Sequence, residues 1–344
     1  MVDRVSAPAR LPLLVRRAVV LWLVFLLLAA AALAQTDPLP SWNDGPAKQA
    51  VLEFVRATTT PGSPDFVPPE ARIATFDQDG TTWVEKPMYT PVLFCLARLR
   101  QLAGAHPELA ATEPFESILS GDPEAMRRLT AEDFDKVCLA TMTGVSVEEL
   151  TEAVRSWLAT ARDARWHRPY TELVYAPMLE VMGLLRQHGY KTYFVTGGSQ
   201  DFVRAYAEPI YGVVPEQVVG SLGAVKYGYA KDGRPTLTEE SRILLETVGT
   251  GKPEGIHLMI GRRPYIAFGN SDGDREMLEY TQAGEGKRLM LLVHHDDALR
   301  EYAYGAQSKV GTFSDSLMNE ARQRGWIVIS MQKDWKRIFA WEGK

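Results

Sequence analysis

The chain is poor in cysteine, in linker-like tracts and in repeats. Only two of its 344 residues are cysteines, Cys95 and Cys138, and neither has the sequence neighbours of a catalytic nucleophile. In an oxidising compartment they can form a disulfide, and two buried thiols are the alternative, so the sequence leaves both open. No tract rich in Gly, Ser or Pro suggests a long disordered linker, and no internal repeat is present. A chain of this length and ordinary composition can form one large domain or two smaller ones.

The long uncharged apolar run of the chain lies at its beginning. Four arginines precede residues 18–34, which are apolar throughout, and Ala32-Leu33-Ala34 has the small-x-small form of a signal-peptidase site. We therefore expect residues 1–34 to be a cleaved signal peptide of the ordinary secretory kind. Because the run is close to the shortest that can cross a bilayer, an uncleaved membrane anchor is the alternative.

The chain also has no excess of positively charged residues. Cleavage would remove four arginines and one aspartate and change the formal net charge from −5 to −8. Such an acidic surface argues against nucleic acid as a partner. It would also repel phosphorylated substrates at long range, so a site for them needs local cations. We expect a periplasmic or secreted protein that meets the membrane only if its N-terminal segment stays uncleaved.

Two carboxylates follow a short stretch with the composition of a buried strand. Residues 73–76 are apolar, β-branched or aromatic, and Asp77 and Asp79 come directly after them, before a glycine. Alternation places both carboxylates on one side of the chain, where they repel each other unless a cation or a proton lies between them. An EF-hand calcium loop is excluded, because Thr82 and Met88 stand where it needs a glycine and a glutamate.

The stretch Asp77-Gln78-Asp79-Gly80-Thr81 resembles the first motif of the haloacid dehalogenase superfamily, in the phosphatase branch related to phosphoserine phosphatase. The dehalogenases themselves generally lack the second aspartate, so Asp79 points to phosphate chemistry. The resemblance implies an α/β fold with a doubly wound parallel sheet (Rossmann-like) and a helical cap domain inserted after the first strand. It divides the chain into a signal peptide (1–34), a core (35–86 and 169–344) and a helical cap (87–168).

The order of predicted elements agrees with this fold. Strands alternate with helices outside residues 91–168, which have helical patterns throughout, and such alternation favours a parallel doubly wound sheet. Ser146 and Glu149 form the pattern of a capping box in the helical stretch. The further predicted elements are helices at 42–58, 177–188, 200–208, 254–259 and 275–280 and strands at 190–195, 264–268, 288–293 and 326–331.

Two later segments resemble the second and third motifs. Strand 190–195 ends at Thr196-Gly197-Gly198 before a helix, where a hydroxyl, backbone N–H groups and the helix dipole can bind an anion. In the family the corresponding hydroxyl and the next N–H bind the phosphoryl group, which implies this role for Thr196 and Gly197, with Gly198 beside them. Lys252 occupies the place of the third-motif lysine and is implied to neutralise charge on Asp77 and the phosphate. Glu85 lies near the position at which phosphoserine phosphatases hold a substrate amine, so it is a candidate substrate contact, and a solvated hinge residue is the alternative.

The fourth motif departs from the family pattern, which is usually Gly-Asp-x-x-x-Asp. After strand 264–268, Asn270 stands where the first aspartate is usual, and Asp274 keeps the second position. Asparagine offers a hard cation a neutral oxygen instead of a charge, so either the metal binds more weakly or Asp272 compensates. The residues that the resemblance assigns to Mg²⁺ are Asp77, Asp79 through its main-chain carbonyl, Asn270 and Asp274.

Together the motifs predict a Mg²⁺-dependent phosphomonoester hydrolase for a small phosphorylated metabolite, such as phosphoserine or a similar ester. Asp77 is implied as the nucleophile that becomes an aspartyl-phosphate, and Asp79 as the general acid and then the general base. Thr196 and Lys252 complete the catalytic set. One alternative is a catalytically weak member that only binds metal or phosphate, which Asn270 suggests. The other is a membrane-anchored interaction protein that uses the helical stretch.

Residues 294–297, His-His-Asp-Asp, invite interpretation as a metal site. Adjacent residues on a strand point in different directions, so we interpret them instead as a polar surface and the cap of a helix that runs to Tyr304.

Overall fold

The structure is a computed structural model that describes residues 37–343, except residues 105 and 108–110. The predicted signal peptide at 1–34 lies outside the described residues. The chain divides into two units, and the fold described below belongs to the second, which begins at Leu39. Within the described residues, no helix has the length and apolar character needed to span a membrane.

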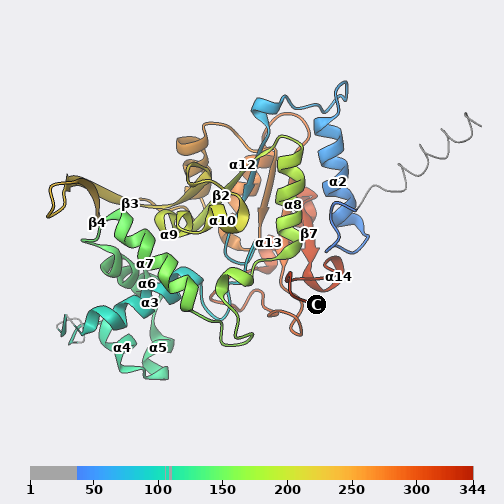
Figure 1. The fold of residues 1–344 in the computed structure, drawn as a ribbon. Coiled ribbons are helices and arrows are strands. Elements are labelled where there is room, and N and C mark those ends of the chain that lie inside the picture. The colour runs from blue at the N-terminus through green and yellow to red at the C-terminus, as the bar shows by residue number, and fades with distance from the viewer. Residues whose placement is uncertain (1–36, 105, 108–110, 344) are drawn as a thin grey trace, which may run out of the picture. The chain divides into compact units, whose positions relative to one another are not determined.

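The described part of the chain forms one seven-stranded sheet. Its strands are β1 (Ile73–Phe76), β2 (Lys191–Ser199), β3 (Val218–Tyr229), β4 (Pro235–Leu245), β5 (Ile266–Gly269), β6 (Leu289–His294) and β7 (Ile327–Ser330). They lie in the order β4-β3-β2-β1-β5-β6-β7. Figure 1 shows the sheet among the helices. All neighbouring pairs are parallel except β3 and β4, which form an antiparallel hairpin. The predicted parallel sheet is confirmed, and β1 lies at its centre between β2 and β5.

Alternate residues of the strands face two different apolar layers. Phe76 of β1 and Phe268 of β5 stack with ring centroids 4.6 Å apart in one layer, whereas Ala267 belongs to the other. Helices α2 (Pro46–Thr59) and α8 (Ala176–Gln187) contribute to the first layer, and α12 (Arg275–Gln282) and α13 (Asp315–Arg324) contribute to the second. The sheet is therefore covered on both faces, as the doubly wound fold requires.

A helical block separates β1 from β2 in the sequence. It consists of α3 (Thr90–Ala103), α4 (Phe115–Ser120), α5 (Pro123–Arg128), α6 (Ala131–Met142) and α7 (Val147–Thr160). The capping box of Ser146 and Glu149 opens α7 as predicted. The β3–β4 hairpin reaches this block (Figure 1), where Glu239 exchanges backbone hydrogen bonds with Val145 and Gly144, each 2.9 Å long. The helices stand where the predicted cap was placed, and the cap boundaries at 87 and 168 stay a prediction.

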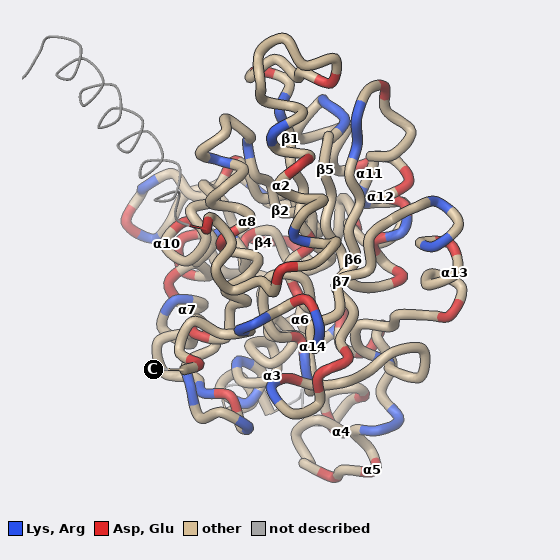
Figure 2. The backbone as a smooth tube through the Cα atoms, turned by 90° about the vertical axis from the view of Figure 1, so that its right-hand side faces the viewer, with Lys and Arg blue, Asp and Glu red and all other residues tan. Residues whose placement is uncertain are grey.

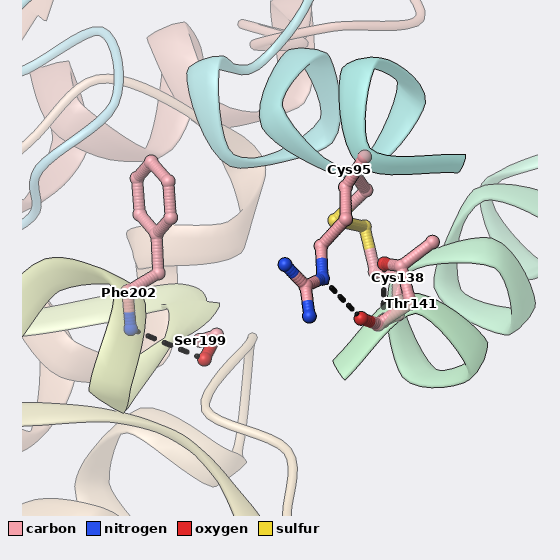
Figure 3. Close-up of a disulfide and its surroundings, with 6 residues drawn as sticks. Cys95, Cys138, Thr141, Ser199 and Phe202 are labelled. Carbon is pink, nitrogen blue, oxygen red and sulfur yellow. Dashed lines mark hydrogen bonds between the residues drawn. A yellow bond between two sulfur atoms is a disulfide. The ribbon is translucent and has the colours of Figure 1, made fainter. Parts of the chain in front are cut away.

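The two cysteines form a disulfide inside the helical block. Cys95 on α3 and Cys138 on α6 are bonded, with their Cα atoms 5.0 Å apart (Figure 3). Beside this bond, Arg98 Nε of α3 donates a hydrogen bond to the carbonyl of Thr141 on α6, with a length of 2.6 Å. Of the two possibilities that the sequence left open, the structure therefore shows the disulfide, and it fastens α3 to α6.

The predicted helix between Asp297 and Tyr304 is wrong. Residues 298–300 form only a turn, which the Asp297 carboxylate holds by accepting from the N–H groups of Leu299 and Arg300. The Arg300 side chain bonds Asp297 and also donates to the carbonyl of Met331, so a distant contact outweighs the local helical pattern. The predicted surface location of His295 is also wrong, because its side chain is buried.

The remaining short elements connect the strands. The helix predicted at 254–259 begins earlier and is divided in two, which places Lys252 in its first turn. The short helical elements of the structure are η1 (Pro69–Ala71), η3 (Tyr170–Glu172), α9 (Gln200–Arg204), α10 (Ala207–Tyr211), η4 (Pro215–Gln217), α11 (Gly251–Gly255), η5 (Ile256–Ile260), η6 (Asp272–Asp274) and α14 (Met331–Asp334).

Candidate active site

Lys252 joins three segments at the edge of the sheet where the parallel strands end. The lysine is only 3% exposed. Its Nζ donates to Asp77 Oδ1 and Asp274 Oδ1, each at 2.6 Å, and to the carbonyl of Val195 at 2.8 Å. An ammonium group has three donors, and all three are used here. Residues that follow β1 and β5 and a residue in the middle of β2 are thus brought together around one buried cation, as the order of the motifs predicted.

Asp274 has both carboxylate oxygens engaged. Oδ1 accepts from Lys252, and Oδ2 accepts from the backbone N–H groups of Asn270 at 2.9 Å and Ser271 at 3.0 Å. A Cβ on Gly269 would lie 2.4 Å from the Asp274 Cβ, so only glycine allows the chain to pass this closely. Asp274 therefore orients Lys252 and the loop after β5, and its role as a metal ligand stays a prediction.

The turn after β1 is folded back on itself and holds the carboxylate of Asp79. The indole N–H of Trp83 donates to Asp79 Oδ1 at 3.1 Å, and the N–H of Gly80 donates to the Trp83 carbonyl at 2.8 Å. Gly80 adopts a φ of +75°, which favours glycine. The sequence after Asp79 is thus a scaffold for that carboxylate.

Burial dominates the electrostatics of this acidic cluster. It raises the pKa of Asp77 to about 7, and the charge of Asp274 adds to the rise while Lys252 opposes it. Burial likewise raises the pKa of Asp79 well above its usual range, and the charges of Asp77 and Glu85 raise it further. For Lys252, burial lowers the pKa, but Asp274 and Asp77 outweigh that effect and the net direction is upward. Ionised carboxylates at this place therefore require more positive charge than one lysine supplies.

Thr196 and Gly198 lie beside Asp79. The Thr196 hydroxyl is buried and accepts from the N–H of Gly198 at 3.1 Å. A Cβ on Gly198 would lie 3.5 Å from this hydroxyl and 3.9 Å from Asp79 Oδ2, so the three groups border one small space. Gly197 is exposed, and a Cβ there would meet a methyl group of Val248 at 2.7 Å. Of the predicted phosphoryl-binding residues, Thr196 and Gly198 are therefore close to the predicted general acid, and no contact joins Gly197 to it.

Glu85 is 1% exposed, and its carboxylate faces the loop after β5. Glu85 Oε1 accepts from Asn270 Nδ2 at 2.8 Å and from the hydroxyl of Tyr304 at 2.6 Å. Asn270 Oδ1 in turn accepts from the Thr81 hydroxyl at 3.0 Å. Burial raises the pKa of Glu85, and the charge of His295 opposes that rise. Contact of Glu85 with a substrate stays a prediction, and the structure shows it as the partner of Asn270.

Two glycines make room for the Glu85 carboxylate. A Cβ on Gly80 would lie 2.4 Å from Glu85 Oε1, and a Cβ on Gly311 would lie 1.7 Å from it. Both glycines have positive φ angles, +75° and +63°. The carboxylate is therefore enclosed by backbone that no other residue type could form. Asp272, the predicted substitute for the missing acid, instead accepts from the Ser314 hydroxyl at 2.8 Å, and its role as a metal ligand is not supported by these contacts.

Sequence reasoning missed His295 and Glu301. His295 Nε2 lies 2.7 Å from the carbonyl oxygen of Gly80, and Nδ1 lies 3.0 Å from Glu301 Oε2. One signal was available, because His295 directly follows β6 and so lies at the same edge of the sheet as Asp77. Its importance depends on burial and on contacts with a segment far away in the sequence, which no local pattern reveals.

The site fits a hard divalent cation by the chemistry of its donors. Within residues 37–343, apart from 105 and 108–110, no three His, Cys, Asp or Glu side chains form a ready-made metal site. The carboxylates of Asp77, Asp79 and Glu85 are nonetheless buried close to one another. The amide oxygen of Asn270 accepts from Thr81 in the same turn. Carboxylate and amide oxygens are the ligands that Mg²⁺ prefers, and a cation would relieve the repulsion that raises these pKa values.

Comparison with known families agrees with this geometry. Residues 74–279, more than half of the chain, match the haloacid dehalogenase-like hydrolases. The chain belongs to this family. The matched stretch begins within β1 and ends in α12, and it contains Asp77, Asp79, Thr196, Lys252, Asn270 and Asp274.

Three solved structures are similar to this chain at low sequence identity, and one of them has a TM-score above 0.5. A protein of unknown function from Bordetella pertussis Tohama I is 18% identical over 75% of this chain and 97% of its own, with a TM-score of 0.46. A functionally unknown protein from Anaerococcus prevotii DSM 20548 is 14% identical over 83% of this chain and 91% of its own, with a TM-score of 0.52. A phosphoserine phosphohydrolase-like protein from Francisella tularensis subsp. tularensis SCHU S4 is 12% identical over 73% and 98%, with a TM-score of 0.38. No curated protein matches this chain significantly.

Proposed function

We propose that this hydrolase cleaves phosphomonoesters with the help of Mg²⁺ and through a phosphorylated Asp77. The observation that carries the proposal is the position of Lys252, which is buried between Asp77 and Asp274 at the edge of the sheet. Thr196 and Asp79 border the same place. Phosphoryl transfer needs a nucleophile, neutralised charge and a proton for the leaving group, and this arrangement offers all three.

In the first step Asp77 forms a bond to phosphorus, and the bond from phosphorus to the leaving oxygen breaks. Asp79 gives its proton to that oxygen, which its raised pKa equips it to do. In the second step Asp79 takes a proton from water, which attacks phosphorus and releases Asp77 and inorganic phosphate. Thr196, the Gly197 N–H and Lys252 stabilise the phosphoryl oxygens. Mg²⁺, when bound, would neutralise charge on the carboxylates and the phosphoryl group, and Asp77, the Asp79 carbonyl and Asn270 would hold it.

We propose a small phosphorylated metabolite, such as phosphoserine or a similar ester, as the substrate. The helical block begins beside the proposed phosphoryl site, because a Cβ on Gly198 would lie 3.4 Å from Pro91 Cγ at the start of α3. This proximity supports the proposal that the block contacts the leaving group as a cap. Basic and acidic residues are interspersed in the view of Figure 2, so attraction of a phosphoester depends on a local cation such as Lys252.

We also propose that the protein is exported to the periplasm or beyond. The predicted signal peptide motivates this, and the Cys95–Cys138 disulfide supports it because such bonds persist in oxidising compartments. Mass spectrometry of the protein recovered from its host tests the proposal. A mature N-terminus at Gln35 is expected, and a protein that retains residues 1–34 would contradict cleavage.

The activity is tested with a panel of phosphomonoesters, with and without Mg²⁺, and release of inorganic phosphate is measured. Asp77→Asn should lower turnover by about a thousandfold or more, because the amide cannot accept the phosphoryl group. Asp315→Asn, an exposed position on α13, is the matched control and should leave turnover unchanged. Circular dichroism checks that both variants fold. Mg²⁺ binding without turnover of any ester would favour a catalytically weak binding protein, the alternative that Asn270 suggests.

A further inference from the structure

His295 lies outside the four motifs but reaches the turn that carries Asp79. It directly follows β6, just as Asp77 directly follows β1, so the two residues leave the sheet at the same edge. It is 3% exposed. Its Nε2 lies 2.7 Å from the Gly80 carbonyl oxygen, its Nδ1 lies 3.0 Å from Glu301 Oε2, and its ring stacks on Tyr304 with centroids 4.3 Å apart.

Both hydrogen-bond partners of this ring are acceptors. A backbone carbonyl only accepts, and Glu301 already receives the N–H of Tyr302 at 2.6 Å and the hydroxyl of Tyr175 at 3.3 Å, one on each oxygen, as an ionised carboxylate does. A neutral imidazole has a single N–H and would direct a lone pair at one of the two oxygens. The contacts therefore favour the doubly protonated form, with fully buried Glu301 as its counter-ion. Burial alone would lower the pKa of His295, but its bonds and the negative charges of Glu301 and Glu85 raise it.

The bond from His295 holds the second peptide after Asp79, the one between Gly80 and Thr81. The Gly80 N–H is bonded to the Trp83 carbonyl, so the peptide before Gly80 is held from one side. The Gly80 C=O is bonded to His295, so the next peptide is held from the other side. Trp83 also donates its indole N–H to Asp79 Oδ1. Without the His295 bond, the Gly80 carbonyl would no longer be held, and the Asp79 carboxylate beside it could move.

We propose that His295 and Glu301 form a buried ion pair that positions the carboxylate of Asp79 for proton transfer by holding the Gly80 carbonyl. The inference rests on the proposed function, because Asp79 has a leaving group to protonate only if the chain cleaves phosphoesters. His295 is a positioning residue, since its ring bonds Gly80 and not Asp79. Glu301 keeps the ring in place and in its charged form.

A misplaced proton donor affects different esters unequally. The 4-nitrophenolate ion leaves without a proton, whereas an alkoxide needs one as its bond to phosphorus breaks. The ratio kcat/KM covers the steps up to departure of the leaving group. Loss of positioning should therefore lower kcat/KM for an alkyl phosphate much more than for 4-nitrophenyl phosphate. General damage to the fold would lower both values by the same factor.

The test compares His295→Gln with its neighbour His294→Gln, using glycerol 2-phosphate and 4-nitrophenyl phosphate. For His295→Gln we expect the loss of kcat/KM with the alkyl ester to exceed the loss with the aryl ester by at least about tenfold. His294 is the matched control, because its ring faces Phe313 and Asp296 instead of the turn. His294→Gln should leave both values within about twofold of the wild type. In the wild-type protein, ¹H–¹⁵N spectra should show protons on both ring nitrogens of His295.

Each other result has a definite meaning. If the wild type is active and His295→Gln loses both activities equally, or if the ring is neutral, the positioning inference is wrong while the proposed function stands. An equal effect of His294→Gln would also overturn it. If the wild type cleaves no ester of the phosphomonoester panel, the proposed function fails and the inference falls with it. A doubly protonated ring would then mark only an ion pair of the fold.

Discussion

The buried carboxylate of Asp77 should couple the stability of the protein to pH and to Mg²⁺. In the metal-free protein the pKa of Asp77 is raised from 3.8 to about 7, chiefly by burial. A raised pKa means that folding favours the protonated form. The resulting stabilisation is fully present below about pH 4 and is lost as the pH rises through about 7. A change from 3.8 to about 7 corresponds to about 4 kcal/mol at most.

A divalent cation should reverse this loss. Mg²⁺ binds the ionised carboxylates, so it competes with protons at pH 5 and binds without that competition at pH 8. The gain in Tm on addition of Mg²⁺ should therefore be larger at pH 8 than at pH 5, by on the order of 5 °C for a domain of this size. Thermal unfolding followed by circular dichroism measures both gains.

Asp77→Asn provides the control for this coupling, because the amide does not titrate. In that variant the difference between the two pH values should shrink markedly. An equal gain in Tm at both pH values in the wild type would refute the reasoning. So would an Asp77→Asn variant that keeps the full pH dependence, since the titrating group would then lie elsewhere.

Three further changes test other parts of the structure. Lys252→Met leaves two buried carboxylates without their cation, so urea unfolding should show that the free energy of unfolding falls by about 3–5 kcal/mol. An unchanged urea midpoint would contradict the buried ion pair. Glu85→Gln should weaken Mg²⁺ binding, measured by calorimetry, by about tenfold, and adding Asn270→Asp to this variant should restore the binding. A double variant that binds no better than Glu85→Gln would contradict the idea that a carboxylate at 270 can replace the one at 85. Replacing Cys95 and Cys138 together by serine removes a link across 43 residues and should lower the free energy of unfolding by about 4 kcal/mol. Equal protease resistance of residues 90–160 with and without the disulfide would contradict this stabilisation.

The sequence predicted the sheet because its central strands are short apolar runs that end at motif residues. The strand predicted at 73–76 is β1 itself, and the one predicted at 264–268 differs from β5 by one or two residues at each end. Parallel strands that share one edge bring Asp77 and Asn270 together. Lys252 lies on α11 and not at the end of a strand, so its contact with Asp77 was expected from the family resemblance. Local patterns suffice where the chemistry follows directly from the end of a strand.

Contacts between distant segments could not be predicted in the same way. Residues 298–304 have a helical pattern, but the bonds of Arg300 to Asp297 and Met331 replace the helix. The disulfide depends on how α3 packs against α6, and sequence spacing does not determine that distance. His295 was missed for the same reason, since its partner Gly80 is 215 residues away in the sequence. Glu301 was missed with it, because its role depends on its contact with His295.

The contact between Glu85 and Asn270 gives a physical account of the unusual fourth motif. An aspartate at 270 would place its carboxylate beside that of Glu85, where the two buried charges would repel each other. Asparagine replaces this repulsion with a hydrogen bond of 2.8 Å and turns its oxygen toward Thr81. Glu85 accepts only, so it also fixes which end of the amide faces it. The negative charge that one segment lacks is therefore present in another, at hydrogen-bond distance. The site therefore retains a negative charge for a cation, although the carboxylate is Glu85 in the segment after β1 and not residue 270 in the loop after β5.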